Sequence, residues 1–171
     1  MNSNDYWQNI KDIVDKKGWA LQMVGPDHDA DIPSFIYTVG LASRGLPDLL
    51  VFGLPRSSAV LVNTAIEKMI AIHGKDPYGL YSGLILDEVA NMPIRMDLAP
   101  IGLAQVFATG ASRHGEETGV TVSIMQLVLP DQAGRFPDDR ACERRMVFIQ
   151  DMPAMKMRLD ALKPSVPREG H

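Results

Sequence analysis

The stretch SIMQLVLPDQAGRFPDD, residues 123–139, decides how the fold is interpreted. Its first part is a nearly continuous apolar run, which is typical of a strand covered on both faces of a sheet. The Pro-Asp pair and the glycine that follow it predict a tight turn. Gln126 is the polar exception in the apolar run. Because residues two apart share a face of a strand, its side chain is predicted to lie with those of Ile124 and Val128.

Further strands and helices are expected on both sides of this stretch. Short apolar runs predict the other strands, and apolar residues spaced three or four apart predict the helices. Strands are expected in WALQMVG, FIYTVGL, LLVFG, SGLILDEV and MPIRMDL. Helices are expected over 4–17, from Ser57 or Ser58 to His73, in IGLAQVFAT and over 139–150, with RHGEETG as a polar loop. The pattern indicates an α+β fold, a mixed and mainly antiparallel sheet packed with three to four helices.

Length and composition restrict the class of protein. The chain has 171 residues, of which 46% are hydrophobic and 22% charged, as expected for one globular domain. We expect this domain over residues 1–150, and a Met- and Pro-rich C-terminal tail, partly disordered, over 151–171. A net charge of −4 argues against nucleic acid as a partner. The lone Cys142 excludes an internal disulfide, and no apolar run suits a membrane span, so we expect a cytoplasmic protein.

Four motifs occur in an order that resembles a known family. They are GWALQMV, FIYTVGL, GLPDLLVFGLP and MQLVLPDQAGRFP. Together they resemble the bacterial family called domain of unknown function 4262, over roughly Ile10 to Asp138. The resemblance implies no activity. In the family pattern a tryptophan precedes the Pro-Asp pair and another follows the Phe-Pro pair, whereas this chain has Leu129 and Asp138.

Five polar residues in or beside apolar strands are candidates for contacts with a small-molecule ligand: Tyr37, Thr38, Gln126, Asp131 and Arg135. A buried amide without partners costs about 1–3 kcal/mol, so Gln126 must bind either a neighbouring loop, the favoured alternative, or a ligand. Tyr37 and Thr38 are predicted on opposite faces of their strand. Asp131 is expected to accept from backbone N–H groups of its own turn, or to face a cleft where Arg135 binds an anionic group.

The remaining patterns specify no reaction. The loop with Asp27, His28, Asp29 and Asp31 carries acidic groups but lacks the glycine and the final glutamate of a calcium-binding EF-hand, so no metal site is predicted. No nucleophile with its base and no phosphate-binding glycine loop is recognisable, which leaves enzyme activity and cofactors unassigned. The favoured function is a pocket for a small-molecule or nucleotide-like ligand. The alternative is a regulatory or inhibitory module that binds a protein partner through the Met-rich C-terminal segment, or that forms a homodimer.

Overall fold

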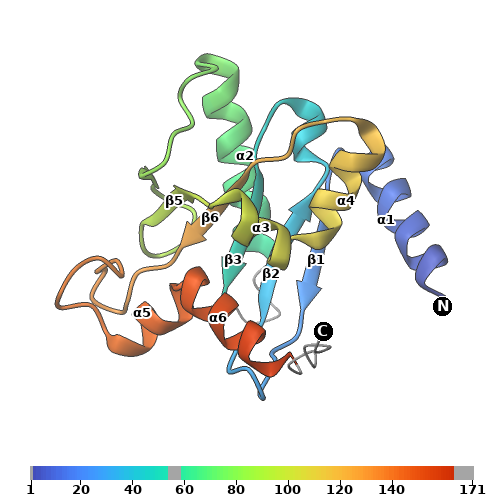
Figure 1. The fold of residues 1–171 in the computed structure, drawn as a ribbon. Helices are drawn as coiled ribbons and strands as arrows, with labels where there is room; N and C mark the ends of the chain where they lie inside the picture. The colour runs from blue at the N-terminus through green and yellow to red at the C-terminus, as the bar shows by residue number, and fades with distance from the viewer. Residues whose placement is uncertain (1, 54–58, 164–171) are drawn as a thin grey trace, which may run out of the picture.

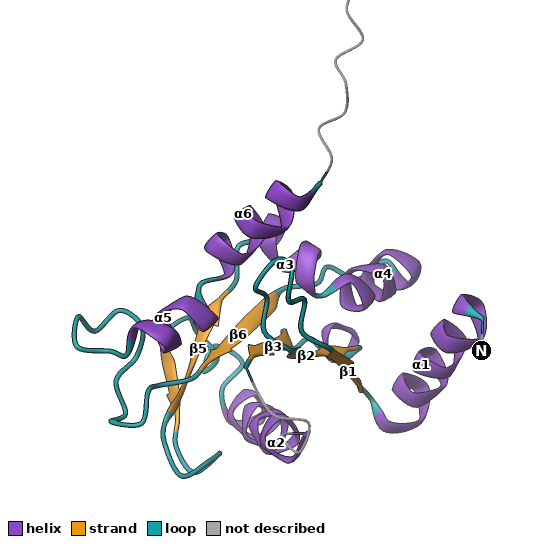
Figure 2. Cartoon of the chain, turned by 90° about the horizontal axis from the view of Figure 1, so that it is seen from below, coloured by secondary structure: helices purple, strands orange, loops and turns teal. Residues whose placement is uncertain are grey.

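The computed structural model describes residues 2–53 and 59–163, and it has the predicted α+β architecture. One mixed sheet is covered by helices on both faces, as Figures 1 and 2 show. The strand order is β1-β2-β3-β6-β5-β4, and every neighbouring pair is antiparallel except β3 and β6, which are parallel. The strands are β1 (Ala20–Val24), β2 (Phe35–Val39), β3 (Asp48–Phe52), β4 (Leu84–Leu86), β5 (Ile94–Leu98) and β6 (Ile124–Val128).

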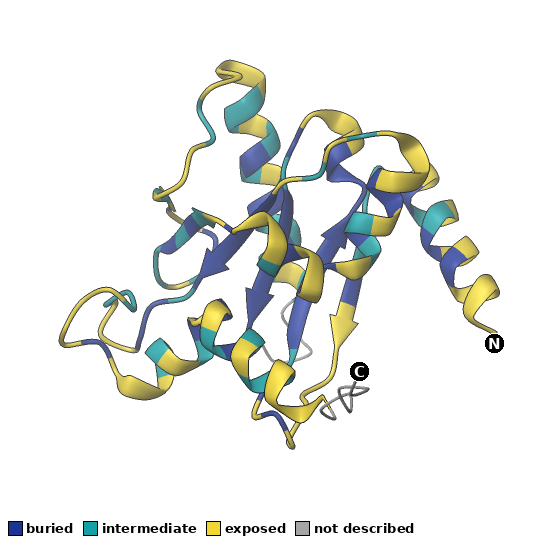
Figure 3. Cartoon of the chain, viewed as in Figure 1, coloured by how far each residue is buried: buried dark blue, intermediate teal, exposed yellow. Residues whose placement is uncertain are grey.

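The helices form a layer on each side of this sheet. Helix α2 covers one face, whereas α3, α4 and α6 cover the other, and α1 lies beside β1 (Figure 2). Their bounds are α1 (Ser3–Lys17), α2 (Ala59–Lys75), α3 (Ile101–Phe107), α4 (Thr109–Thr118), α5 (Arg144–Gln150) and α6 (Met152–Leu162), with a 3₁₀ turn η1 (Leu41–Arg44). The central strands β2, β3 and β6 are buried on both faces, as their apolar runs predict (Figure 3).

Alternate residues of each central strand belong to two separate cores. In β6, Ile124 belongs to the core under α3, α4 and α6, whereas Met125 and Leu127 belong to the core under α2. The predicted assignment of faces in this strand is therefore confirmed. In the first core an aromatic cluster joins the sheet to α3, since the rings of Phe52 and Phe107 meet edge to face at 5.2 Å.

The segment that was predicted to be a polar loop, RHGEETG, is instead the C-terminal half of α4. Two glycines obscure the helical pattern, and both mark places where other parts of the chain come close. A Cβ atom on Gly115 would lie 2.4 Å from a methyl group of Val122, and one on Gly110 would lie 2.8 Å from the hydroxyl of Tyr37. These glycines therefore let α4 pack directly on β2 and on the segment before β6.

The ends of other helices also differ from the predictions. Asn2 caps α1, since its side chain accepts a hydrogen bond from Asp5 N at 2.9 Å, so the helix begins one residue before the predicted start. Gly18 ends it in the left-handed conformation at φ 94°, as expected. Helix α2 continues past His73 to Lys75. The predicted capping residues of α2, Ser57 and Ser58, lie outside the described residues.

The Met-rich segment after α5 contributes to the core. Helix α6 begins at a cap in which Asp151 Oδ1 accepts from Ala154 N at 3.0 Å. Met152 and Met155 are buried in the core under α3 and α4, whereas Met157 is exposed. Packed structure therefore extends beyond residue 150 to α6, and a disordered tail remains a prediction for residues outside the described part. In the described chain, no helix combines the length and apolar character needed to cross a bilayer.

Candidate functional site

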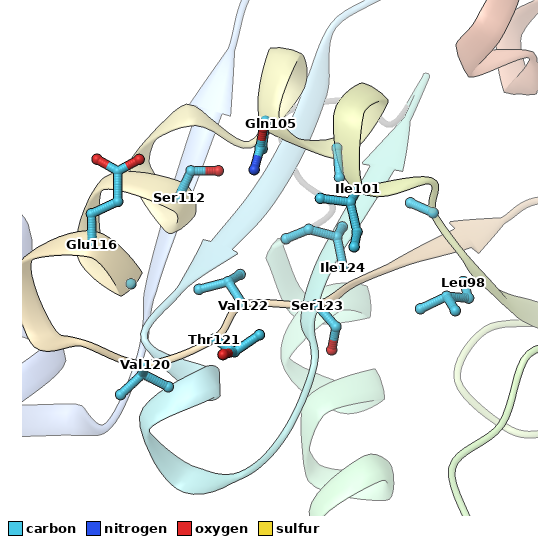
Figure 4. Close-up of a pocket in the computed structure, with 13 residues that line it drawn as sticks. Leu98, Ile101, Gln105, Ser112, Glu116, Val120, Thr121, Val122, Ser123 and Ile124 are labelled. Carbon is cyan, nitrogen blue, oxygen red and sulfur yellow. The ribbon is translucent and has the colours of Figure 1, made fainter.

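A cavity of about 390 Å³ lies between α3, α4 and the extended segment 120–124 that leads into β6. Figure 4 shows how this segment alternates: Val122 and Ile124 point towards the two helices, whereas Ser123 points to the other side. Ile101 of α3 and Leu98 at the end of β5 complete the apolar wall. The cavity thus lies between α3 and α4 on one side and the apolar side chains on one face of this extended segment on the other.

Polar side chains occur at the end of the cavity that is formed by the helices. Gln105 of α3 and Ser112 of α4 extend their polar atoms into the space between the helices (Figure 4). The Ser112 hydroxyl donates to the carbonyl of Ala108 at 3.3 Å, a long bond within α4. Within the described residues, the amide of Gln105 has no hydrogen-bond partner. Because Gln105 is exposed, the polar end of a ligand can bind this amide in place of solvent.

Glu116 gives the cavity rim a negative charge. Its side chain extends from α4 at the end away from Leu98 (Figure 4), and it makes no ion pair or hydrogen bond with any described residue. Among the described residues, no arginine, lysine or histidine lines the cavity. The geometry thus suits an apolar molecule that is neutral or positively charged at its polar end, and it disfavours a negatively charged one.

A second, more open hollow of about 370 Å³ lies between α1, β1, β2 and the start of α4. We call it the Tyr37 groove, because it is lined by this predicted site residue. Tyr37 is only 6% exposed, and its hydroxyl accepts a hydrogen bond from Gly110 N at 3.1 Å. Across the groove, the hydroxyl of Tyr6 donates to Gln22 Oε1. Tyr37 is one of the five predicted site residues. In the described part of the chain, the other four line neither the cavity nor the groove.

Thr38, on the opposite face of β2, is bound to a buried carboxylate. Its hydroxyl donates to Asp48 Oδ1 at 2.7 Å and accepts from Leu49 N at 2.8 Å. Asp48 also accepts from the backbone N–H groups of Leu41, at 3.1 Å, and Ala42, at 3.4 Å. Burial raises the pKa of Asp48 to about 6, although these hydrogen bonds oppose the rise. The pair connects η1 to the start of β3.

Gln126 binds a backbone carbonyl on α5. Its Nε2 atom donates to Gln150 O at 2.9 Å, and both residues are buried. The Gln150 side chain returns to the sheet, with Nε2 3.3 Å from Phe52 O and Oε1 3.4 Å from Leu129 N. These contacts match the favoured alternative, in which the amide anchors a neighbouring segment. A ligand contact for Gln126 remains a prediction.

Asp131 and Arg135 form a turn that is bonded within itself. Asp131 Oδ1 accepts from Ala133 N and Arg135 N, at 3.0 and 2.9 Å, while Oδ2 accepts from Arg135 Nε at 2.9 Å and Glu143 N at 3.0 Å. Desolvation alone would raise the pKa of Asp131, but the hydrogen bonds outweigh it and lower the pKa to about 2. Cys142 beside the turn is buried, which raises the pKa of its thiol.

The acidic loop after β1 is a turn closed by its own residues. The carboxylate of Asp27 accepts from the backbone N–H groups of Asp29 and Ala30, both at 3.1 Å. Among residues 2–53 and 59–163, no group of three or more His, Cys, Asp or Glu is arranged to hold a metal ion. The side chain of Asp27 therefore holds the backbone of this turn in place.

The sequence reasoning missed the residues of α4 that line the two hollows. Ser112 and Glu116 line the cavity, while Gly110 and Arg113 line the groove. One signal could have revealed this helix. Arg113 and Glu117 are four apart and form an ion pair of 3.0 Å, and opposite charges at this spacing favour a helix, because side chains four apart are neighbours on a helix surface.

Comparison with protein families gives one match that covers most of the chain. Residues 13–143 match a family described as Domain of unknown function (DUF4262). The matched region extends from α1 to the residue before α5, so it includes the whole sheet, both hollows apart from part of α1, and the turn of Asp131. No curated protein and no solved structure matches the chain.

Proposed function

Because the chain belongs to the family of domain of unknown function 4262, we propose a function based on the cavity inside the matched region: the protein binds a small, mainly apolar molecule between α3 and α4. The polar end of this molecule is neutral or positively charged. The observation that carries the proposal is the cavity itself, which combines an apolar wall with two polar side chains, Gln105 and Glu116, that bond to no described residue.

The volume limits the size of the ligand. An engineered apolar cavity of about 150 Å³ is known to hold benzene, so by proportion a cavity of about 390 Å³ holds roughly 15 non-hydrogen atoms. Leu98 and Ile101 lie at the cavity and are 56% and 70% exposed, so they can cover a ligand that extends beyond it. A medium-length alkyl chain or a small ring system fits this space.

The wall also specifies where the ligand's polar end lies. Gln105 and Ser112 lie between the two helices, and Glu116 extends from α4 beyond them (Figure 4). A hydroxyl or an ammonium group placed here gains a hydrogen bond or an attractive charge. A carboxylate placed here is repelled by Glu116 and meets no cationic side chain in the part of the chain that the structure describes.

Binding of three octyl compounds tests this proposal, because they share an apolar chain and differ in the charge of their polar end. We expect octan-1-ol and octylamine to bind with measurable heats in calorimetry at pH 7 and to raise the melting temperature. Octanoate is expected to bind at least about tenfold more weakly than octylamine. Glu116→Gln should remove most of the difference between octylamine and octanoate, because it removes the charge at the rim.

Two variants that fill the cavity provide the controls. Ala104→Leu and Ser112→Leu add methyl groups to the wall, and we expect both to weaken octan-1-ol binding by about tenfold or more. Ala71→Leu, on an exposed part of α2, is the matched control and should bind as the wild type does. Equal affinity of octan-1-ol for the two folded cavity variants and the control would contradict the proposal.

The alternative, a partner-binding surface on the Met-rich segment, has less support. Two of its methionines, Met152 and Met155, are buried in the core and cannot contact a partner without unfolding α6. Met157 is the exposed member of the segment in α6.

A further inference from the structure

The Tyr37 groove carries features that the proposed cavity lacks, namely positive charge and unused hydrogen-bond donors. We propose that this groove is a second binding site, and that it takes an aromatic carboxylate or a similar planar organic anion. The inference is independent of the cavity, because the two hollows lie on different sides of α4 and share no lining residue.

The hydroxyl of Tyr37 supplies the first donor. Tyr37 is 94% buried, and its oxygen accepts from Gly110 N at 3.1 Å. Its own hydrogen has no acceptor among the residues that the structure describes. A buried hydroxyl normally donates as well as accepts, so a ligand acceptor in the groove would complete its bonding.

Arg113 supplies the charge, and its neighbours hold it in place. Its guanidinium lies over the ring of Trp7 at 4.5 Å from the ring centre. Its Nε donates to Glu117 at 3.0 Å, and Glu117 is itself held by Trp7 Nε1 at 2.9 Å. The two terminal nitrogens of the guanidinium make no hydrogen bond to a described residue. They remain available for a bidentate contact with a carboxylate.

The start of α4 contributes in the same direction. Thr109 and Gly110 line the groove at the start of the ten-residue helix, where the N–H of Gly110 donates to the Tyr37 hydroxyl. The positive end of the helix dipole favours an anion here. This contribution adds to that of Tyr37 and Arg113, on which the site depends.

The outer wall of the groove accounts for the aromatic body of the ligand. Tyr6, Met23 and Val24 line it and are 51%, 52% and 37% exposed. An aromatic ring laid on these side chains covers exposed apolar surface, while its carboxylate reaches Tyr37 and Arg113. The ring of Trp7 does not serve as the platform, because it is buried and covered by Arg113.

The test compares benzoate with benzamide, a neutral molecule of nearly the same shape, on the full chain by NMR titration at pH 7 and low salt. We expect benzoate to bind at least about fivefold more tightly, with shifts at the backbone amides of Gly110 and Tyr37. Arg113→Gln should weaken benzoate by about tenfold with little effect on benzamide, because it removes the charge, whereas Tyr37→Phe should weaken benzoate by about fivefold through loss of one donor. Arg44→Gln is the matched control, since Arg44 also covers a tryptophan, Trp19, which packs against the core on the other face of the sheet.

Equal binding of benzoate and benzamide would overturn the inference, as would unchanged benzoate affinity in Arg113→Gln. Inorganic phosphate should bind more weakly than benzoate, since it cannot use the apolar wall. Tighter binding of phosphate would show a site that recognises charge alone and would refute the aromatic ligand class. Because neither variant touches the cavity, octan-1-ol binding should persist in both and thus distinguishes failure of this inference from failure of the proposed function.

Discussion

Replacing Asp48 with asparagine should remove a pH dependence of stability that burial of this carboxylate creates. Asp48 is 1% exposed, and its pKa rises from 3.8 to about 6 in the folded protein. Between these values the folded state binds more protons than the unfolded state, so the free energy of unfolding falls as pH rises. This contribution to the free energy of unfolding is lost once the pH is well above the pKa of Asp48 in the folded protein. Each pKa unit corresponds to about 1.4 kcal/mol, so the wild type should lose about 2–3 kcal/mol between pH 4 and pH 7 from this group.

The Asp48→Asn variant isolates this contribution. The asparagine oxygen can still accept from Thr38 Oγ1 and Leu41 N, whereas the amide nitrogen takes the place of the oxygen that lies 3.4 Å from Ala42 N. Its neutral amide does not titrate. Urea unfolding at several pH values from 4 to 7, followed by tryptophan fluorescence, gives both stability curves. From pH 4 to pH 7, we expect the free energy of unfolding of the wild type to fall by about 2–3 kcal/mol relative to that of the variant. Parallel curves for the two proteins would refute the reasoning.

Three further predictions concern the contacts around the sheet and α4. Gln126→Ala should lower the free energy of unfolding by about 1–3 kcal/mol, since it leaves the buried carbonyl of Gln150 without its donor; unfolding in urea measures this, and an unchanged midpoint contradicts it. Gly115→Ala should destabilise because its Cβ would clash at 2.4 Å, whereas Gly74→Ala in α2 meets nothing within 4 Å and should stabilise by about 0.5–1 kcal/mol. Thermal melts of both glycine variants check the two signs, and a shared direction would disprove the packing argument. Asp131→Asn should be less stable than wild type at pH 7, with a difference that shrinks as pH falls towards about 2; a constant difference would count against the lowered pKa.

The strands and their faces could be predicted because both depend on local pattern. Three apolar runs gave β2, β3 and β6, and the two-residue period placed Gln126 on the same face as Ile124. The turn at Asp131 was equally local, since its carboxylate binds N–H groups two and four residues further on. The family resemblance was also correct, because the family matches residues 13–143, and all four quoted motifs lie within them.

The two hollows could not be predicted, because they depend on segments that are distant in sequence. In the Tyr37 groove, for example, Tyr37 binds Gly110, which is 73 residues away. Helix α4 was missed because its glycines suggest a loop, although in the fold they permit close packing. Contacts between such distant residues leave no pattern in the composition or in the hydrophobic periodicity. The residues that line the two hollows could therefore be identified only in the three-dimensional structure.

The most direct test of the central claim is a solution NMR experiment that locates octan-1-ol on the protein. The proposed function predicts saturable binding, with intermolecular contacts from the alkyl chain to the methyl groups of Ile101, Val122 and Ile124, and loss of these contacts in Ala104→Leu. Contacts confined to other surfaces, or contacts to these methyl groups that persist in Ala104→Leu, would contradict it.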